Sequence, residues 1–528
     1  MECGRNTNPD PWVAKLYVEL SPPRLGDNLA DVERLLRGVA ERFPGKHIYA
    51  PHRLWNSISR TLRDARFKVT AVLSDFGNVI ELSAIEPGDT TDVLLGLAVD
   101  LGTTSIVFYL TDLRSGEVLA ETSAANPQIE HGCDVLTRIH FAGEKGGLET
   151  LQRLAIDCVN LHAEQMCREN GASPHSIYAA TVAGNTTMTH LFLGLDPYYI
   201  RREPYIPVRN KPGFVAAQEL GLTFNPGAHV YVFPNVGSYF GGDLVAGILY
   251  SGMHKETEVS ILVDIGTNAE VVLGNRDWLL ACAGAAGPAL EGGVAQMGMQ
   301  AGDGVIDHIR IDPESLKTAY TIIGDGKPRG MCGSALIDLT AELFLRGIID
   351  IQGKFQPEGP VPLGNTEDGL YFVVVPAEES ALGRDITLSQ IDLDVLLRSK
   401  AAMYTILQTI IGEVGIGFAD LHRFYVAGTF GAYIDPKRAV TLGMVPDIPL
   451  EKYTTLGNSS GKGACLLLTD RRLFAEIESI SEKLTYLELN VNQMFMNLFS
   501  ASRFIPHTDR SLFPSVSTDQ EERNGRLV

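Results

Sequence analysis

The chain of 528 residues carries 64 acidic side chains against 44 Lys and Arg, a formal net charge of −20. This balance excludes nucleic acid as a main partner, because proteins that bind phosphate backbones carry a surplus of Lys and Arg. A hydrophobic content of 45% is typical of a globular protein, and the length exceeds what one core supports, so several domains are expected.

Membrane insertion and secretion are not predicted. The chain has no apolar run long enough for a membrane helix, and residues 1–30 lack the apolar segment of a signal peptide. The cysteines are scattered, with no CxxC pair: Cys3, Cys133, Cys158, Cys167, Cys282, Cys332 and Cys465. We therefore expect a cytoplasmic protein with reduced thiols, without a disulfide framework or a metal cluster built from this chain alone.

The N-terminal part predicts a flexible segment at 1–10 and a small α/β domain at 11–90. Alternating apolar residues predict strands at 12–20, 67–73 and 78–85. Helically spaced apolar residues predict helices at 29–43 and 51–65. The Glu86-Pro87-Gly88-Asp89 segment then suits a domain junction.

The remaining chain predicts two halves of similar order, at 92–255 and 256–485, followed by a C-terminal extension and tail at 486–528. Each half opens with a strand hairpin and continues into helices. The order predicts a duplicated βββαβα architecture with a cleft between the halves. After residue 486 the pattern predicts one or two more strands.

Two glycine-rich stretches, each entered from an apolar strand, are the strongest functional signal. They read Asp100-Leu101-Gly102-Thr103-Thr104-Ser105 and Asp264-Ile265-Gly266-Thr267-Asn268. Glycine lets main chain approach a phosphate, and successive N–H groups form an anion site. An Asp beside phosphate is repelled unless a cation intervenes, which predicts Mg²⁺ held through water. Either stretch alone could be only a strand with a glycine turn; the recurrence favours two related loops around one nucleotide.

Other turns at strand ends are candidates for nucleotide contacts. A helix that begins there can meet phosphate, and small residues there let adenine and ribose approach. Each could instead be a simple helix cap or a tightly packed turn. The candidates are Gly184, Asn185, Thr186, Gly241, Gly242, Asp243, Gly333, Ser334, Gly428, Thr429, Phe430 and Gly431.

A loop of small residues at 281–293 suits close approach by a bulky flat group or a partner surface, although it could also be a hinge. Its candidate partner-facing residues are Gly284, Ala285, Gly287, Pro288 and Glu291. The Gly/Ser-rich segment 457–461 precedes an apolar helix and could be no more than a loop.

Together these strings resemble the ATPases of the acetate/sugar kinase, chaperone and actin superfamily. More narrowly they resemble the reductive activators of corrinoid proteins, including the activating enzymes of O-demethylases. The resemblance covers about residues 10–512 and includes ATVAGNTTMTHL at 180–191, PNVGSYFGGD at 234–243, VAGTFGAYID at 426–435 and RFIPHTDRSLFPSV at 503–516. It implies an actin-like (ribonuclease H-like) ATPase core that binds ATP and returns inactive Co(II) cobalamin to Co(I).

The resemblance also implies roles. Asp100 and Asp264 would be catalytic and would organise Mg²⁺ and its water, with the glycine loops around the phosphates and Gly428 to Phe430 beside adenosine. Partners would be a corrinoid protein of a methyltransferase or O-demethylase system and a ferredoxin-like electron donor, and relatives of this kind are often homodimers.

Relatives usually carry an N-terminal ferredoxin-like domain whose two-iron two-sulfur cluster is held by four cysteines. Cys3 alone cannot hold such a cluster. We therefore expect no iron–sulfur cluster in this chain, and a cluster in a separate polypeptide or in a segment missing from this sequence.

Two other functions remain open at this point. A small-molecule kinase on the same scaffold would need a base at the cleft, and Asp243 could serve as one. A nucleotide-gated interaction protein without turnover would also use both glycine loops.

Overall fold

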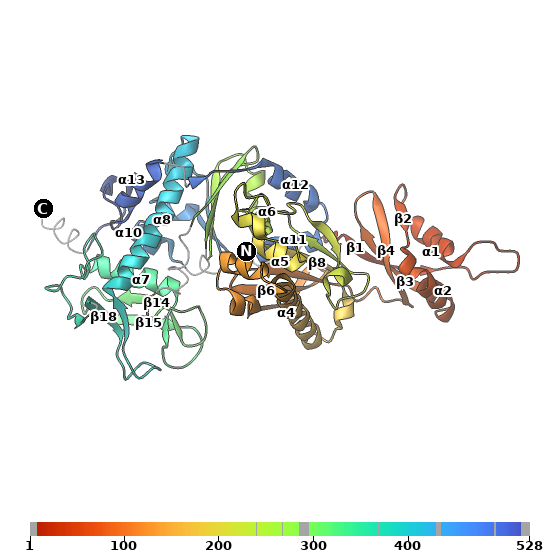
Figure 1. Ribbon diagram of the computed structural model, residues 1–528, viewed down its shortest axis with the longest axis horizontal. Helices are drawn as coiled ribbons and strands as arrows, with labels where there is room; N and C mark the ends of the chain where they lie inside the picture. The colour runs from red at the N-terminus through yellow and green to blue at the C-terminus, as the bar shows by residue number, and fades with distance from the viewer. Residues whose placement is uncertain are drawn as a thin grey trace. The chain divides into compact units, whose positions relative to one another are not determined.

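The computed structural model describes residues 8–238, 240–266, 268–284, 295–367, 369–428, 434–489 and 493–518. The chain forms two compact units: unit 1 comprises Met1–Tyr250 and Ser460–Glu482, and unit 2 comprises Ser251–Ser459 and Lys483–Val528 (Figure 1). None of the helices in these described stretches has the length and apolar character needed to cross a membrane.

Unit 1 begins with a small sheet of order β1-β3-β4-β2, with helices α1 and α2 packed on it. Leu35, Val39, Ile58 and Leu62 bring the apolar faces of both helices onto buried residues of β3 and β4. The elements are β1 (Val13–Glu19), α1 (Asp31–Ala40), β2 (His47–Tyr49), α2 (Trp55–Asp64), β3 (Lys68–Asp75) and β4 (Val79–Pro87). The predicted strands and helices of this small α/β domain are confirmed.

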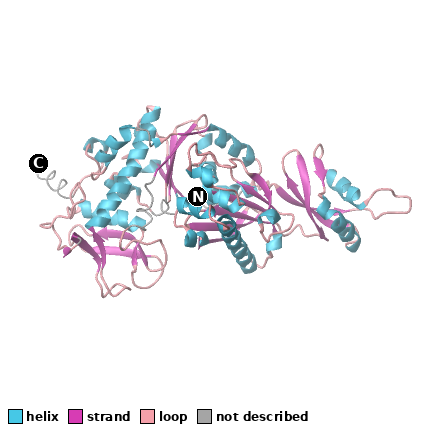
Figure 2. Cartoon of the chain, in the orientation of Figure 1, coloured by secondary structure: helices cyan, strands magenta, loops and turns pink. Residues whose placement is uncertain are grey.

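The large sheet of unit 1 has the order β7-β6-β5-β8-β10-β9. Figure 2 shows the strands of the chain in magenta and its helices in cyan. β5, β6 and β7 form an antiparallel meander, whereas β8 and β10 continue the sheet parallel to β5. Its strands are β5 (Leu95–Leu101), β6 (Ser105–Asp112), β7 (Glu117–Ala125), β8 (Ile177–Gly184), β9 (Gly213–Ala216) and β10 (His229–Val232). Its helices are α3 (Val135–Ala142), α4 (Gly147–Glu169), α5 (Thr186–Leu193), α6 (Gly242–Ser251), α11 (Ser459–Thr469) and α12 (Leu473–Lys483).

The large sheet of unit 2 repeats this arrangement, with the order β21-β20-β11-β12-β13-β22. β11, β12 and β13 form the antiparallel meander, and β20 and β21 continue parallel to β11. Its strands are β11 (Ser260–Ile265), β12 (Ala269–Gly274), β13 (Leu279–Gly284), β20 (Phe424–Ala427), β21 (Tyr453–Gly457) and β22 (Leu484–Tyr486). The repeated order confirms the predicted duplication.

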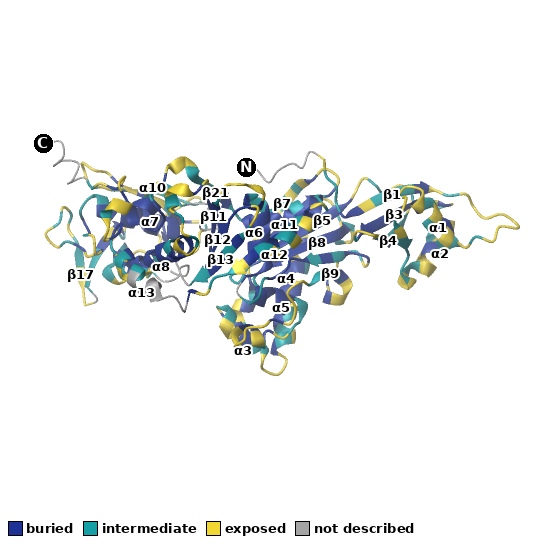
Figure 3. Cartoon of the chain, turned by 90° about the horizontal axis from the view of Figure 1, so that it is seen from above, coloured by how far each residue is buried: buried dark blue, intermediate teal, exposed yellow. Residues whose placement is uncertain are grey.

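Unit 2 also contains two three-stranded sheets, β15-β14-β16 and β17-β18-β19. Their strands are β14 (Val305–Ile311), β15 (Thr318–Ile322), β16 (Gly330–Met331), β17 (Gly364–Thr366), β18 (Gly369–Val375) and β19 (Ile386–Ser389). Its helices are α7 (Gly333–Leu345), α8 (Gln390–Val414), α10 (Pro436–Leu442) and α13 (Gln493–Ser502). Figure 3 shows how much of α7, α8 and the large-sheet strands is buried.

The end of the chain differs from its prediction. After the short strand β22, the predicted further strand is replaced by α13, which packs against α8. The segment that follows is held by Lys400 of α8, whose buried Nζ donates to the Pro506 carbonyl at 2.7 Å and to the Phe504 carbonyl. Burial lowers the pKa of Lys400 well below its usual value.

We expect Lys400→Met to loosen the segment that follows α13. The substitution leaves two carbonyl groups without their donor, which costs about 1–3 kcal/mol. Amide hydrogen exchange over residues 504–516 is expected to speed up by roughly tenfold or more. Lys354→Met is the matched control, because Lys354 is half exposed in its ion pair with Asp394. Unchanged exchange in Lys400→Met would contradict this account.

Candidate functional site

The first glycine loop lies at the end of β5 and is held by the segment after β7. A Cβ on Gly102 would lie 2.4 Å from the Ser105 carbonyl oxygen, so the turn requires glycine. Asn126 donates from Nδ2 to the Gly102 carbonyl at 2.8 Å, and its backbone N–H donates to the Thr104 carbonyl at 2.8 Å. Asn126 thereby fixes two carbonyl groups of the loop.

A buried cation lies behind the same loop. Arg138 of α3 is fully buried and donates to the Thr103 carbonyl at 2.6 Å and to the Gly132 carbonyl at 2.9 Å. Burial lowers the pKa of its guanidinium to about 10, which leaves it charged near neutral pH. Both acceptors are neutral carbonyl groups, and the charge of Asp134 also acts on the guanidinium.

The structure brings two more predicted stretches to this loop. Gly184 ends β8, where its Cβ would lie 2.8 Å from the Leu101 carbonyl oxygen. Asn185, the N-cap of α5, donates from Nδ2 to the Thr103 hydroxyl at 2.9 Å. A Cβ on Gly241 would lie 2.2 Å from the Asn185 Cα. The glycines therefore let the backbones of the three turns approach closely.

Two carboxylates of unit 1 influence one another. Burial raises the pKa of the Asp243 carboxyl, in the first turn of α6, to about 7, and the negative charge of Asp100 adds to the rise. Asp100 lies on β5 and accepts a hydrogen bond from the Ser460 hydroxyl at 2.8 Å. A carboxyl that titrates near pH 7 can take a proton from water or a hydroxyl group.

The second glycine loop has a related arrangement within unit 2. Asp264 lies on β11 opposite Ala427 of β20, and Gly428 follows with φ of +88°. A Cβ on Gly428 would lie 2.4 Å from the Ile265 carbonyl oxygen and 2.9 Å from the Asp264 Oδ1. The glycine predicted beside adenosine therefore packs directly on the second Asp stretch.

The remaining predicted residues are placed as follows. In the second loop, the Gly266 N–H donates to the Asn268 carbonyl at 2.9 Å. The buried Ser334 hydroxyl donates to the Asp307 carbonyl at 2.9 Å at the start of α7, and Gly284 ends β13 against Ile406. Several predicted residues lie outside the described part of the chain: Thr267, Ala285, Gly287, Pro288, Glu291, Thr429, Phe430 and Gly431.

Three residues of the unit 1 site were missed by sequence reasoning: Asn126, Arg138 and Ser460. Asn126 had a local signal, because an Asn directly before Pro127 is a typical helix cap, and its side chain does accept the Gln128 N–H. Ser460 lies in the Gly/Ser-rich segment that could have been only a loop. Arg138 had no local signal.

The donor set fits Mg²⁺. In each unit, the Asp (Asp100 in unit 1, Asp264 in unit 2) offers hard oxygen ligands, the kind that Mg²⁺ binds. Within the described ranges, no group of three or more His, Cys, Asp or Glu side chains is gathered to hold a metal ion directly.

Two sheets that share the order of five strands, each with an Asp on its first strand and a glycine loop after it, define an actin-like ATPase fold. Protein-family comparison agrees: residues 258–517 match the "C-terminal domain of RACo the ASKHA domain", 95–256 the "RACo middle region" and 4–92 the "RACo linker region". The ASKHA match implies ATP binding.

Individual relatives identify the family. The corrinoid activation enzyme RamQ of Eubacterium limosum is 33% identical over 417 residues, which cover 77% of this chain and 69% of RamQ. The "[Co(II) methylated amine-specific corrinoid protein] reductase" of Methanosarcina barkeri is 24% identical, over 77% of this chain and 76% of the reductase. A solved "Reductive activator for corrinoid,iron-sulfur protein" is 40% identical with a TM-score of 0.89, covering 97% of this chain and 82% of that protein.

The chain belongs to the family of reductive activators of corrinoid proteins. This assignment confirms the predicted resemblance and supports it over the small-molecule kinase.

We expect Arg138→Gln to weaken ATP binding by roughly 10- to 100-fold, because the change removes a charged donor to the phosphate-loop carbonyl and a nearby positive charge. Calorimetric titration with Mg-ATP measures the effect, and thermal unfolding checks that the variant is folded. Arg153→Gln, on the exposed side of α4, is the matched control. Wild-type affinity in a folded Arg138→Gln variant would rule out this role for Arg138.

Proposed function

We propose that the protein reactivates a corrinoid protein by an ATP-dependent, one-electron reduction of its cobalamin. Inactive Co(II) gains one electron and becomes Co(I), and the electron donor is oxidised by one electron. The observation that carries the proposal is the 40% identity to a reductive activator across 97% of this chain. RamQ and the Methanosarcina reductase, by their names, also act in corrinoid activation.

In this proposal the electron comes from a ferredoxin-like domain or protein, and the acceptor is the corrinoid protein of a methyltransferase or O-demethylase system. Reduction to Co(I) is uphill from ordinary donors, so ATP must supply the driving force, for example by withdrawing a ligand from cobalt. The small-residue loop from Gly284 to Glu291 is proposed to face the corrinoid protein. We further propose a cytoplasmic protein that forms a homodimer.

The proposed ATP contacts follow from the two Asp–Gly loops. The N–H and hydroxyl groups of 102–105 and 266–268 bind phosphates, with Arg138 adding positive charge behind the first loop. The residues from Gly428 to Gly431 bind adenosine, and Asp100 and Asp264 orient water around Mg²⁺. Mg²⁺, when bound, neutralises phosphate charge. Asp243 takes the proton of the water that attacks the terminal phosphate, giving ADP and phosphate.

Asp100→Asn and Asp264→Asn are each expected to lower ATP-dependent Co(I) formation by roughly 100-fold or more, because a neutral amide cannot balance the cation that accompanies ATP. The assay follows the Co(II) and Co(I) absorption spectra of a corrinoid protein supplied with reduced ferredoxin and Mg-ATP. Asp157→Asn, exposed on α4, is the control. Full activity in both variants, or phosphate transfer to a metabolite, would refute the proposal.

The rate of ATP hydrolysis is expected to rise with pH and to level off above about pH 8. Asp243 has a pKa near 7 and accepts a proton only as the carboxylate, which dominates above that pKa. Steady-state kcat between about pH 6 and pH 8.5 measures the profile. Asp243→Asn should be slow and should lose this rise, whereas an unchanged profile would show that another group is the base.

A further inference from the structure

One helix of unit 1 connects the Asp100 loop to the small α/β domain. Ser460, in the first turn of α11, is 5% exposed and donates its hydroxyl to the Asp100 Oδ1 at 2.8 Å. Midway along the helix, the Ala464 carbonyl accepts a hydrogen bond from the Thr181 hydroxyl of β8 at 2.9 Å. α11 is therefore fixed to the carboxylate at its start and to the central strand at its middle.

The other end of α11 is joined to the N-terminal segment by backbone hydrogen bonds. The Asp10 N–H donates to the Thr469 carbonyl at 2.8 Å, and the Arg471 N–H donates to the Asp10 carbonyl at 2.8 Å. These bonds lie directly before β1. Two backbone hydrogen bonds therefore join the start of the small domain to the end of α11.

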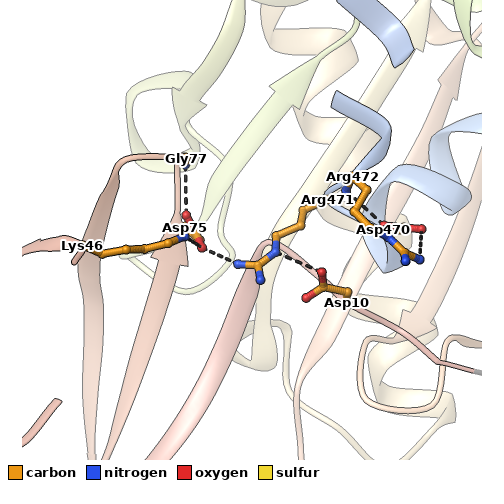
Figure 4. A network of polar contacts seen from close by, with 7 residues as sticks. All are labelled: Asp10, Lys46, Asp75, Gly77, Asp470, Arg471 and Arg472. Atoms are coloured by element: carbon orange, nitrogen blue, oxygen red, sulfur yellow. Dashed lines mark hydrogen bonds and ion pairs between the residues drawn. The ribbon is translucent and has the colours of Figure 1, made fainter. Parts of the chain in front are cut away.

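Side chains strengthen the same junction (Figure 4). Arg471 donates from Nε to the Asp10 carboxylate at 3.1 Å and from Nη1 to the carboxylate of Asp75, at the end of β3. Asp75 also pairs with Lys46 and accepts the Gly77 N–H at 3.0 Å. One guanidinium thus links the end of α11 to two separate segments of the small domain.

The neighbouring arginine lacks this link. Arg472 turns back to Asp470, with Nε and Nη2 at 2.8 and 2.7 Å from its carboxylate oxygens (Figure 4). Both arginines follow α11, but the hydrogen bonds of Arg472 go to Asp470 in its own segment. Arg472 is therefore a control of equal charge and nearly equal position.

An aromatic cluster packs beside the junction and includes a tryptophan. Trp12 is 1% exposed, and its ring centroid lies 4.9 Å from that of Phe214 on β9. Phe474 of α12 lies 5.3 Å from Phe214 and 4.9 Å from Tyr231. A shift of the helical segment after α11 would change the packing around Trp12.

We propose that Ser460 and Arg471 are positioning residues for Asp100, and that α11 couples the nucleotide loop to the small N-terminal domain. A helix of 11 residues is a stiff element about 16 Å long. Because polar contacts hold the start of α11 to Asp100 and the segment after its end to Asp10 and Asp75, we expect displacement at one end to move the other. The inference rests on the proposed role of Asp100 in ATP binding.

The test uses the full chain with Trp55→Phe and Trp278→Phe, which leaves Trp12 as the single tryptophan. Mg-ATP binding is measured by calorimetry, and Trp12 emission is recorded during the same titration. We expect ATP to shift the emission in this background and in Arg472→Gln. In Arg471→Gln the shift should fall at least about threefold, with Arg471→Lys intermediate because it keeps the charge but loses the planar fork.

Ser460 is tested through catalysis. Ser460→Ala is expected to lower kcat for ATP hydrolysis by roughly tenfold, with a smaller change in KM, because the Asp100 carboxylate loses a donor that fixes it. Ser460→Thr keeps the hydroxyl and should restore most of the rate, which a role in packing alone would not predict.

The outcomes separate this inference from the proposed function. If the background protein binds no ATP, both fail. ATP binding with unchanged Trp12 emission overturns the coupling alone, as does an Arg471→Gln variant indistinguishable from Arg472→Gln. Equal kcat in Ser460→Ala and the parent overturns the positioning role of Ser460. If Arg471→Gln does not fold, Arg471→Lys against Arg472→Gln decides the question.

Discussion

The site in unit 1 depends on close backbone packing at the ends of two parallel strands. β5 and β8 deliver Leu101 and Gly184 side by side, and no Cβ fits between the Gly184 Cα and the Leu101 carbonyl. The same constraint recurs where Gly241 meets Asn185. These contacts bring the loop at 102–105, the N-cap of α5 and the strand that carries Asp100 close together. Larger side chains would force these turns apart.

Unit 2 contains the same kind of close contact between a glycine and the strand that carries the Asp. In unit 2 the strand equivalent to β8 is β20, and the glycine after it is Gly428. Its missing Cβ would meet the carbonyl of Ile265, the residue after Asp264. Gly184 and Gly428 are therefore corresponding positions, each required by the residue that follows the Asp of the first strand. The two glycines belong to motifs that look unrelated in the sequence, GNTT and AGTFG, and the sheet topology explains both.

Sequence patterns predicted the parts of this arrangement that depend on neighbouring residues. Asp100 and Gly102 lie in one hairpin, so strand and turn signals suffice to find them. Asn126 and Arg138 reach the loop from other elements, and Ser460 approaches from α11, so their roles arise only when the chain folds. The C-terminal helix α13 was mistaken for strand because its conformation is set by packing against α8. Local propensity is overridden there by tertiary contact.

Charge balance explains why nucleotide and cation must arrive together. Asp100 and Asp243 place two carboxyl groups near one another in unit 1, and the pKa of Asp243 near 7 already reflects burial and its acidic neighbour. Arg138 supplies one buried positive charge behind the loop, too little to offset two carboxylates and a nucleotide. ATP without Mg²⁺ would raise the pKa of Asp243 further and keep it protonated, and a protonated carboxyl cannot accept a proton from water. In the proposed reaction, Mg²⁺ would supply opposing positive charge when bound, and Asp243 would then be able to ionise and accept the proton.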